Sequence, residues 1–394
     1  LKLVRFETIS VIGLGYIGLP TAAAFAARQK KVIGVDVNQH AVDTINQGKI
    51  HIVEPDLDKT VKTAVEAGYL KAFTTPQKAD AFLIAVPTPF KDDHKPDLSY
   101  VMAAAESIAP FLKKGDLIIL ESTSPTGEDS DIDIDIDIAY CPERVLPGKV
   151  MIELIENDRV IGGMTMKSSQ RASELYKIFL AGECVLTNAK TAEMCKLVEN
   201  SFRDVNIAFA NELSFICAEQ GINVWELISL ANRHPRVNIL QPGPGVGGHC
   251  INPKQARLIH TARLVNDSKP VWVVEQVKTA LADCVTETGK LANEIKIACF
   301  GLAFKADIDD LRESPAMQIT KIIADWHRGC TYVVEPNIDE LPKVLNGPCQ
   351  LVSTEVAIAN ADIILLLVDH QQFKAINGEQ IPQKWVVDTK GVWR

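Results

Sequence analysis

The stretch TISVIGLGYIGLP, residues 8–20, begins as a short apolar run and continues through three closely spaced glycines in a GxGxxG pattern. The run predicts a β-strand, and the helix-forming residues after the glycines predict a helix. A second apolar strand follows and ends in Asp36, 18 positions after Gly18. A glycine pattern alone is weak evidence, but in this strand–turn–helix–strand context it predicts a dinucleotide-binding domain.

Each glycine of the pattern has its own expected task. Gly13 permits the tight turn, Gly15 lets a pyrophosphate approach the backbone, and Gly18 packs the helix against the strand. The phosphates then lie at the helix N-terminus, where N–H groups and the helix dipole favour anions. Asp36 is expected to bind the ribose hydroxyls and to repel a 2′-phosphate, which favours NAD over NADP. The alternative is a βαβ turn that binds no phosphate.

The composition is that of an ordinary globular protein, and 394 residues are enough for two or three domains. A net charge of −9 favours neither a nucleic acid nor an anionic membrane as partner. The nine cysteines are scattered and form no CxxC pair, which argues against a disulfide framework or a zinc site and for the reducing cytoplasm. No apolar run reaches the roughly 18–20 residues of a membrane span, and the N-terminus has no signal-peptide pattern.

Two further predicted strands, residues 81–86 and 117–120, end in polar loops that contain Thr88 and Thr123. Ligands bind outside the carboxyl ends of the strands in an open parallel sheet, so both threonines are candidates for the cofactor side of the site. The alternative for each threonine is that it only forms a turn.

The stretch 131–138 alternates strictly between aspartate and isoleucine. Alternation predicts a half-buried strand, although aspartate is a poor strand former. Residues 139–145 then predict a strand end that presents Glu143 and Arg144. This pair is a candidate for the site, with a surface salt bridge as the alternative.

Residues 191–220 contain no proline or glycine and predict one long helix of roughly 45 Å. Polar residues recur on it three or four positions apart and therefore share a side: Glu193, Lys196, Asn200 and Arg203. Such a stripe is usually solvated, but the largely apolar residues that follow indicate burial. A buried lysine needs a partner or a task as acid or base, so Lys196 is a catalytic candidate.

A further helix, predicted over residues 224–230, ends in a cationic turn that contains His234 and Arg236. Arginine suits bidentate binding of phosphate or carboxylate, and an exposed turn is the alternative. The segment QPGPGVGGHC, residues 241–250, follows, and its glycines and prolines exclude a helix or a paired strand. We expect a loop that presents Cys250 as a nucleophile, against the alternative of a buried structural cysteine.

The last part of the chain predicts a second sheet. Residues 271–293 predict a helix that leads to a domain boundary, and strands are expected from residue 294 and at 331–336, 363–369 and 385–388. This sheet lacks GxGxxG, so it binds a nucleotide differently or is structural. The predicted fold is of the α/β class: two Rossmann-like parallel-sheet domains, residues 1–190 and 294–394, joined by a long helix in a helical middle domain, residues 191–293.

Together these motifs resemble the UDP-sugar 6-dehydrogenases, the family of UDP-glucose dehydrogenase, over nearly the whole chain. The resemblance is carried by VIGLGYIGLP at residues 11–20, EST at 121–123, PERV at 142–145, AEMCK at 192–196, GVGGHC at 245–250 and GLAFKADIDDLRESPA at 301–316. Residues 200–208 resemble the branch of the family that acts on N-acetylhexosamine nucleotides.

The resemblance implies oxidation of the C6 alcohol of UDP-N-acetyl-D-mannosamine to a carboxylate, with two NAD reduced in succession. It also implies a place in bacterial envelope polysaccharide synthesis of the enterobacterial common antigen type. Lys196 and Asn200 would manage the reacting oxygen and its proton, and Cys250 would carry a thiohemiacetal and then a thioester. Thr123 and Glu143 would place the hydrolytic water.

The resemblance further implies binding residues and a homodimer. NAD would be contacted by Gly13, Gly15, Tyr16, Ile17, Gly18, Asp36, Thr88, Thr123 and Arg312. The nucleotide sugar would be held by Arg144, Val145, Lys196, Asn200, Arg203, His234, Arg236, Gly247, Phe304, Lys305 and Lys390. The long helix would form the core of the dimer, and Arg236 would reach toward the site of the neighbouring subunit.

The sequence departs from the family pattern in two loops. The family has an aspartate four residues after the cysteine, where it assists the base, whereas this chain has Lys254 there and a shorter segment after it. The segment between Thr126 and Ala139 is also shorter. If both deletions are real, the base lacks its partner. The alternative, which we favour, is that two loops are omitted from the sequence.

Other functions stay open on the sequence alone. UDP-N-acetylglucosamine differs from the expected substrate at one stereocentre that no single residue decides, and UDP-glucose is a further candidate. A two-electron hydroxyacid dehydrogenase would use Lys196 and Asn200 but leave Cys250 without a task. An NAD-sensing binding protein without catalysis would be consistent with the missing aspartate.

Overall fold

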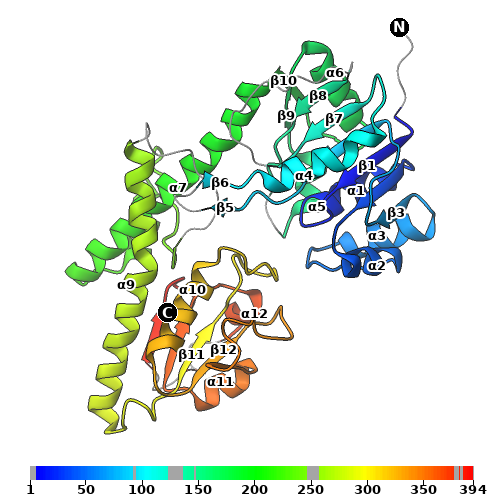
Figure 1. Cartoon of the computed structure of the whole chain (residues 1–394). Helices are drawn as coiled ribbons and strands as arrows, with labels where there is room; N and C mark the ends of the chain where they lie inside the picture. The colour runs from blue at the N-terminus through cyan, green and yellow to red at the C-terminus, as the bar shows by residue number, and fades with distance from the viewer. Residues whose placement is uncertain are drawn as a thin grey trace. The chain divides into compact units, whose positions relative to one another are not determined.

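The structure of the chain is a computed structural model, shown in Figure 1. It describes residues 6–91, 95–122, 136–145, 148–245, 257–376, 381 and 385–393. Contacts divide the chain into two compact units, residues 1–199 and 200–394, and each unit is described by itself. The expected division into three domains stays a prediction.

Unit 1 is built on an eight-stranded sheet with the strand order β10-β9-β8-β7-β4-β1-β2-β3 (Figure 1). The strands are β1 Thr8–Ile12, β2 Lys31–Val35, β3 Leu70–Phe73, β4 Ala81–Ile84, β7 Leu117–Leu120, β8 Asp137–Tyr140, β9 Arg159–Gly163 and β10 Cys184–Asn188. All neighbours are parallel except β8 and β9. The strands expected around residues 8, 31, 81 and 117 are thereby confirmed. The first part of the Asp–Ile alternation lies outside the described residues.

Side chains alternate across this sheet and build an apolar core on each face. In β1, Ile9 and Val11 join one core, and Ile12 joins the other. The helices of unit 1 are α1 Gly18–Ala27, α2 Gln39–Asn46, α3 Leu57–Glu66, α4 Ser99–Ile108, α5 Val150–Glu156 and α6 Met166–Tyr176. Only α4 contributes to the second core, whereas the other five pack into the first. A short 3₁₀ turn, Ala109–Phe111, and the ribbon of β5 Phe90–Lys91 with β6 Lys95–Pro96 complete the described elements of the unit.

Unit 2 is built on a five-stranded, fully parallel sheet with the order β13-β12-β11-β14-β15. Its strands are β11 Ile297–Phe300, β12 Thr331–Val334, β13 Cys349–Leu351, β14 Ile363–Leu366 and β15 Trp385–Asp388. Its helices are α8 Val224–Ala231, α9 Arg257–Thr288, α10 Pro315–Trp326, α11 Thr354–Asn360 and α12 Gln371–Lys374. Helices α9 and α10 pack on one face, and α11 and α12 pack on the other. The α/β fold class with two parallel-sheet parts is confirmed.

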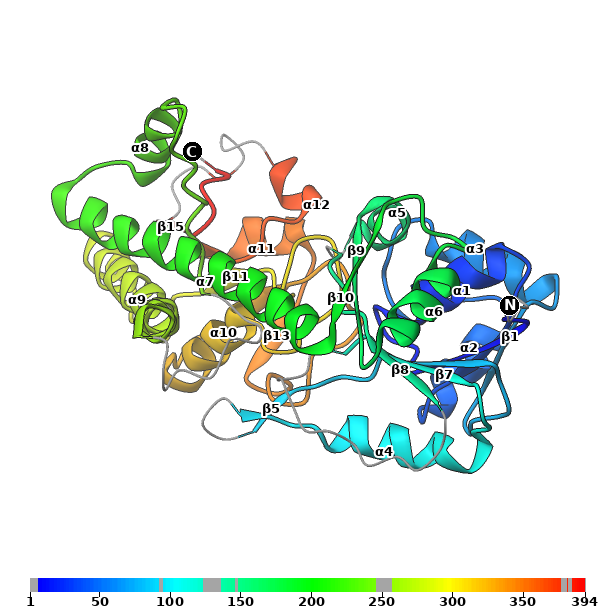
Figure 2. The ribbon, with the colours of Figure 1, turned by 90° about the horizontal axis from the view of Figure 1, so that it is seen from above.

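The long helix is confirmed as α7, Ala189–Gln220, which begins in unit 1 and ends in unit 2. Within unit 2, α7 lies beside α9 (Figure 2), and the two helices are joined by a hydrogen bond of 2.9 Å from Asn211 to Asn266. Within the described ranges, none of the helices has the length and apolar character needed to cross a membrane.

The predicted start of the helix at residue 271 is wrong. Helix α9 begins at Arg257 and runs through Pro270, which removes one backbone donor from the ladder without ending the helix. The turn before the proline is held by side chains, because Asn266 and Lys269 are buried and hydrogen-bonded to α7. Packing against α7 thus outweighs the tendency of Pro270 to end the helix.

Candidate functional site

The glycine turn between β1 and α1 has the geometry expected for a phosphate cradle. Gly13 has a positive φ of 90°, and a Cβ there would lie 2.7 Å from the carbonyl oxygen of Ala85. A Cβ on Gly18 would lie 1.7 Å from the carbonyl oxygen of Gly13. At Gly15 a Cβ would meet nothing within 4 Å, so this part of the backbone is open to a ligand.

Two further features of this turn fit an NAD molecule. No side chain caps the N-terminus of α1 at Ile17, and such a terminus favours an anionic phosphate. At the end of β2, the Asp36 carboxylate accepts hydrogen bonds of 2.9 Å from the backbone N–H groups of Leu14 and Asn38. The carboxylate is thereby fixed beside the glycine turn, where a ribose would follow the pyrophosphate.

The loops after β4 and β7 meet at the same edge of the sheet. Thr88 is buried after β4, and the Ser122 hydroxyl donates a hydrogen bond of 2.7 Å to the carbonyl oxygen of Val86. Thr123, the other predicted threonine, lies outside the described residues. This edge, at the carboxyl ends of the strands, is where the sequence predicts that the cofactor binds.

A buried polar cluster, which was not predicted from the sequence, surrounds Glu121 directly after β7. The Tyr176 hydroxyl donates to its Oε1 at 2.7 Å, and Arg159 pairs with the same oxygen at 3.2 Å. The guanidinium of Arg159 also lies 4.0 Å from the centre of the Tyr176 ring. Burial raises the pKa of Glu121, and Arg159 opposes that rise. Partners that are 38 and 55 residues away left no local pattern to find.

The predicted catalytic lysine is paired with the predicted glutamate. Lys196 donates a hydrogen bond of 2.6 Å to the backbone carbonyl of Glu143, and its Nζ lies 3.8 Å from Glu143 Oε2. Their side chains are 14% and 15% exposed, so the pair is reachable without being fully solvated. The Glu143 carboxylate also accepts the backbone N–H of Val145. A lysine and a carboxylate held together in this way can share the handling of one proton.

The neighbouring Arg144 is also fixed to α7. It binds Glu199 through two nitrogens, at 2.7 and 3.2 Å, and donates to the carbonyl oxygen of Asp158. The alternative of a surface salt bridge applies to Arg144, because its side chain and that of Glu199 are 33% and 41% exposed, whereas Glu143 pairs with the less exposed Lys196. The Glu143–Lys196 and Arg144–Glu199 contacts hold the loop after β8 against α7.

Glu193 stands one turn before Lys196 on the same stripe of α7. Burial raises the pKa of Glu193 to about 7, and the nearby Lys190 opposes the rise. Of the remaining stripe residues, Asn200 and Arg203 belong to unit 2.

In unit 2, a cavity of about 280 Å³ brings together four of the predicted substrate residues. These are Arg203, Phe304, Lys305 and Lys390. The backbone of residues 241–245 forms another part of its wall. The Lys390 ammonium lies 3.6 Å from Asp369 Oδ1, and Asp369 also binds Lys374 at 2.8 Å. The described wall of the cavity carries three cations, Arg203, Lys305 and Lys390, against the one carboxylate of Asp369, and this surplus of positive charge suits a diphosphate.

A chain of buried amides holds this wall in place and was also missed from the sequence. The backbone N–H of Gly243 donates to Asn211 Oδ1 at 3.0 Å, and Asn211 in turn donates to Asn266 at 2.9 Å. Asn266 donates to the Asp204 carboxylate at 2.7 Å, and Arg263 pairs with that carboxylate at 3.3 Å. The loop that leads to Cys250 is therefore anchored to α7 and α9 at Gly243.

Several predicted residues of unit 2 do not line its cavity of about 280 Å³. His234 and Arg236 lie exposed on the turn after α8, where His234 Nδ1 accepts the backbone N–H of Arg236 at 3.3 Å. Arg312 pairs with Asp310 at 2.6 Å. Gly247 and Cys250 lie outside the described residues, as does Lys254. Among the residues that the structure describes, no cluster of His, Cys, Asp and Glu could hold a metal ion.

Comparison with known proteins gives matches over almost the entire chain. The UDP-glucose/GDP-mannose dehydrogenase family matches with its NAD binding domain at residues 7–180, its central domain at 190–280 and its UDP binding domain at 298–394. The first match contains the glycine turn and Asp36, and the last contains most of the cationic cavity wall.

Curated relatives are similar at high identity. The chain is 69% identical to a UDP-N-acetyl-D-mannosamine dehydrogenase from Yersinia pestis, over 99% of this chain and 100% of the relative. It is 58% identical to an NDP-N-acetyl-D-galactosaminuronic acid dehydrogenase from Ralstonia nicotianae, over 99% and 97%. The first alignment spans 422 residues against the 394 of this chain, so at least 28 of its positions have no counterpart here.

Solved structures agree with the same assignment. The UDP-N-acetyl-mannosamine dehydrogenase from Staphylococcus aureus superposes with a TM-score of 0.86 at 41% identity, covering 98% of this chain and 95% of that one. The sequence matches and the structural match together cover both units. The chain therefore belongs to the UDP-glucose/GDP-mannose dehydrogenase family.

Proposed function

We propose that this protein is a UDP-N-acetyl-D-mannosamine 6-dehydrogenase, which oxidises the C6 alcohol of the sugar to a carboxylate. The observation that carries the proposal is the 69% identity, over the full length, to the enzyme of that name from Yersinia pestis. The 58% identity to the Ralstonia nicotianae enzyme makes an N-acetylgalactosamine nucleotide the main competing substrate. The product would serve bacterial envelope polysaccharides of the enterobacterial common antigen type.

The overall reaction converts one alcohol, two NAD⁺ and one water into one carboxylate, two NADH and three protons. NAD, when bound, supplies the hydride acceptor for both oxidations. The residues of the chain hold it: the open backbone at Gly15 and the N-terminus of α1 receive the pyrophosphate, and Asp36 receives the ribose hydroxyls. Tyr16, Ile17, Thr88, Thr123 and Arg312 are proposed further contacts.

Lys196 and Asn200 are proposed to bind the reacting oxygen and manage its proton. The pairing of Lys196 with Glu143 supports this assignment, because it fixes the ammonium and supplies a proton acceptor beside it. Cys250 is proposed to add to the aldehyde through its sulfur, which forms a C–S bond and a thiohemiacetal. Loss of hydride from that carbon gives a thioester.

Water is then proposed to attack the thioester carbonyl, with Thr123 and Glu143 placing it. The C–S bond breaks, the carboxylate leaves, and the thiol of Cys250 is restored. Glu143 can act as the base because its carboxylate is anchored by Val145 and Lys196. This chain has Lys254 where the family has an aspartate that assists the base, so the base would lack that partner if the difference is real.

Unit 2 is proposed to hold the UDP part of the substrate in its cationic cavity. Arg203, Phe304, Lys305 and Lys390 line that cavity, and residues 298–394 match a UDP binding domain. The remaining proposed substrate contacts are Arg144, Val145, His234, Arg236 and Gly247. We further propose three functional parts, residues 1–190, 191–293 and 294–394.

We also propose that the protein is a homodimer whose core is α7, with Arg236 reaching toward the site of the other subunit. Exposed large apolar side chains on α7 support this proposal, among them Phe202 at 70% and Phe209 at 52% exposure. A cytoplasmic location is proposed as well, since all eight cysteines in the described part of the chain are free thiols.

An NADH-production screen tests the substrate assignment. Purified protein with excess NAD is offered UDP-N-acetylmannosamine, UDP-N-acetylglucosamine, UDP-N-acetylgalactosamine and UDP-glucose in separate assays. We expect the highest kcat/KM with UDP-N-acetylmannosamine. A clear preference for UDP-glucose would contradict the assignment to the N-acetylhexosamine branch, and NADH formation from hydroxy acids without UDP would favour a two-electron dehydrogenase.

A further inference from the structure

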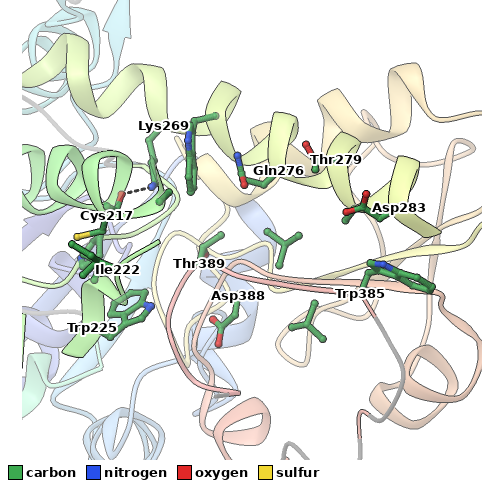
Figure 3. A pocket seen from close by; sticks show the side chains of 18 residues that line it. Cys217, Ile222, Trp225, Lys269, Gln276, Thr279, Asp283, Trp385, Asp388 and Thr389 are labelled. Carbon is green, nitrogen blue, oxygen red and sulfur yellow. Dashed lines mark hydrogen bonds between the residues drawn. The ribbon is translucent and has the colours of Figure 1, made fainter. Parts of the chain in front are cut away.

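Unit 2 contains a second cavity, of about 390 Å³, that the proposed reaction does not use. It lies between α8, α9, β15 and the C-terminal part of α7, and Figure 3 shows side chains from all four elements around it. Cavities of this size are typical of sites for small organic molecules.

Helix α9 forms one long wall of this cavity. Lys269, Gln276, Thr279 and Asp283 recur along it at helical spacing, and Figure 3 shows Lys269 and Asp283 at opposite ends of the row. Three tryptophans, Trp225, Trp272 and Trp385, supply the aromatic surface. Such walls favour a planar, apolar ligand body.

Lys269 is a buried cation at one end of the cavity. It is only 3% exposed, and its Nζ donates a hydrogen bond of 2.6 Å to Ser214 Oγ. The ammonium also lies 3.7 Å from the centre of the Trp272 ring and 4.6 Å from that of Phe215. Within the described part of the chain it makes no ion pair with a carboxylate. Burial lowers the pKa of Lys269 to about 7, as expected for an ammonium without a counter-ion.

The other charged groups among the described residues that line the cavity are both acidic. Asp388 of β15 is occupied, because its carboxylate accepts the backbone N–H groups of Lys390, Gly391 and Trp393. Asp283 of α9 is 14 residues from Lys269, roughly 21 Å along the helix axis. Among the described residues that line the cavity, Lys269 is the one cation, which favours a ligand with a single negative charge over a phosphate dianion.

We propose that this cavity binds a small aromatic carboxylate, with the carboxylate at the Lys269 ammonium and the ring against the tryptophans. The ion pair supplies a counter-ion that no described residue gives Lys269, and the indole rings bury the apolar body. Binding stabilises the charged form of the lysine, so the protein takes up a proton when the ligand binds above pH 7.

Calorimetric titration of the full-length protein tests the proposal, with NAD and UDP at saturation so that the nucleotide sites are blocked. The probes are 2-naphthoate, its uncharged isostere 2-naphthamide, and inorganic phosphate. At pH 6.5 we expect 2-naphthoate to bind at least tenfold more tightly than 2-naphthamide, and phosphate not to bind measurably. At pH 9 we expect the Kd of 2-naphthoate to be at least tenfold weaker, because Lys269 loses its proton while the ligand keeps its charge.

Two variants locate the site. Lys269→Met should remove the preference for the carboxylate, whereas Lys278→Met, at an exposed lysine of the same helix, should keep it. Thr279→Trp fills the mouth of the cavity from an exposed position, leaves Lys269 intact, and should weaken both naphthyl probes at least tenfold. This variant keeps the test valid if Lys269→Met does not fold. Equal affinity for the two naphthyl probes, unchanged binding in Lys269→Met or Thr279→Trp, or no binding of 2-naphthoate would each overturn the proposal.

Discussion

In both sheets, the first strand is followed by a glycine turn whose next backbone N–H binds a carboxylate. In unit 1, Gly13 follows β1 with φ of 90°, and the next backbone N–H, of Leu14, binds the Asp36 carboxylate at the end of β2. In unit 2, Gly301 follows β11 with φ of 92°, and the next N–H, of Leu302, binds the Glu335 carboxylate after β12. Both glycines also donate to the carbonyl of the neighbouring strand at 2.8 Å.

The two carboxylates nevertheless have different surroundings. Asp36 is partly exposed beside the open backbone of Gly15, whereas Glu335 is 4% exposed and pairs with the buried His370 at 3.1 Å. Helix α1 begins five residues after its glycine, but α10 begins only at Pro315. Glu335 is thus buried and paired in the interior, and in the described stretch from Gly301 to Pro315 no helix begins next to the glycine turn.

Under the proposed function, this difference gives two kinds of nucleotide site on one frame. Unit 1 offers backbone N–H groups and a helix terminus to a pyrophosphate. Unit 2 offers charged side chains, with Arg203, Lys305 and Lys390 around its cavity. We therefore expect changes at Asp36 to affect ligand binding and changes at Glu335 to affect folding.

The largest effect is expected for Glu335→Ala. The change leaves His370 and the N–H groups of Leu302 and Ala303 buried without their acceptor, so the free energy of unfolding should fall by about 3–5 kcal/mol. Denaturant unfolding measures it. A loss below about 1 kcal/mol would show that Glu335 is not an interior anchor.

Asp36→Ala should act on NAD rather than on the fold. Loss of the ribose contact should weaken NAD binding by about 10- to 100-fold, equivalent to roughly 1.4–2.8 kcal/mol, with kcat changed less than KM for NAD. Asp43→Ala, on the exposed side of α2, is the matched control and should leave the Kd unchanged. Equal Kd values for NAD in Asp36→Ala and wild type would remove Asp36 from the cofactor site.

Asn211→Ala tests whether the wall of the unit 2 cavity depends on a side-chain anchor. The change removes the acceptor of the Gly243 N–H and the donor to Asn266 Oδ1, so we expect a loss of about 1–3 kcal/mol in stability and a lower kcat/KM for the UDP-sugar. Asn206→Ala is the control, because the one described hydrogen bond of its amide is to the Phe202 carbonyl of its own helix. Identical kinetics in the two variants would show that substrate binding in the unit 2 cavity does not depend on Asn211.

The smallest effect is a pH dependence from Lys269. The pKa of this lysine is about 7 in the folded protein and about 10.4 in an unfolded chain, so the unfolded chain binds more protons between these values. The free energy of unfolding should therefore rise with pH above 7, by at most about 1.4 kcal/mol per unit. Denaturation of wild type and Lys269→Met from pH 7 to 9 measures this slope, which the variant should lose. Parallel curves would show that Lys269 is not desolvated.

Most of the fold could be predicted from sequence because its signals are local. Apolar runs marked the strands, and the glycine pattern marked the first turn. The errors came where distant contacts outweigh local ones: Pro270 continues a helix that α7 packs against, and β13 has only three residues, too few for a clear pattern.

The site was predictable to a smaller extent. Lys196 and Glu143 were both selected from sequence motifs, and the structure brings them together. The buried polar pairs after β7 and behind the Gly243 loop were not found, because Glu121 with Arg159 and Asn211 with Asn266 pair across 38 and 55 residues. Such pairs carry no periodicity in the sequence and become visible only when the elements are packed.

The count of NADH formed per UDP-N-acetylmannosamine consumed, in wild type and in Cys250→Ser, tests the central claim most directly. We predict two NADH and one uronic acid per sugar in wild type, and no net acid formation in the variant, which lacks the thiol needed for the thioester. One NADH per sugar in wild type, or undiminished acid formation in Cys250→Ser, would contradict the four-electron mechanism proposed for this protein.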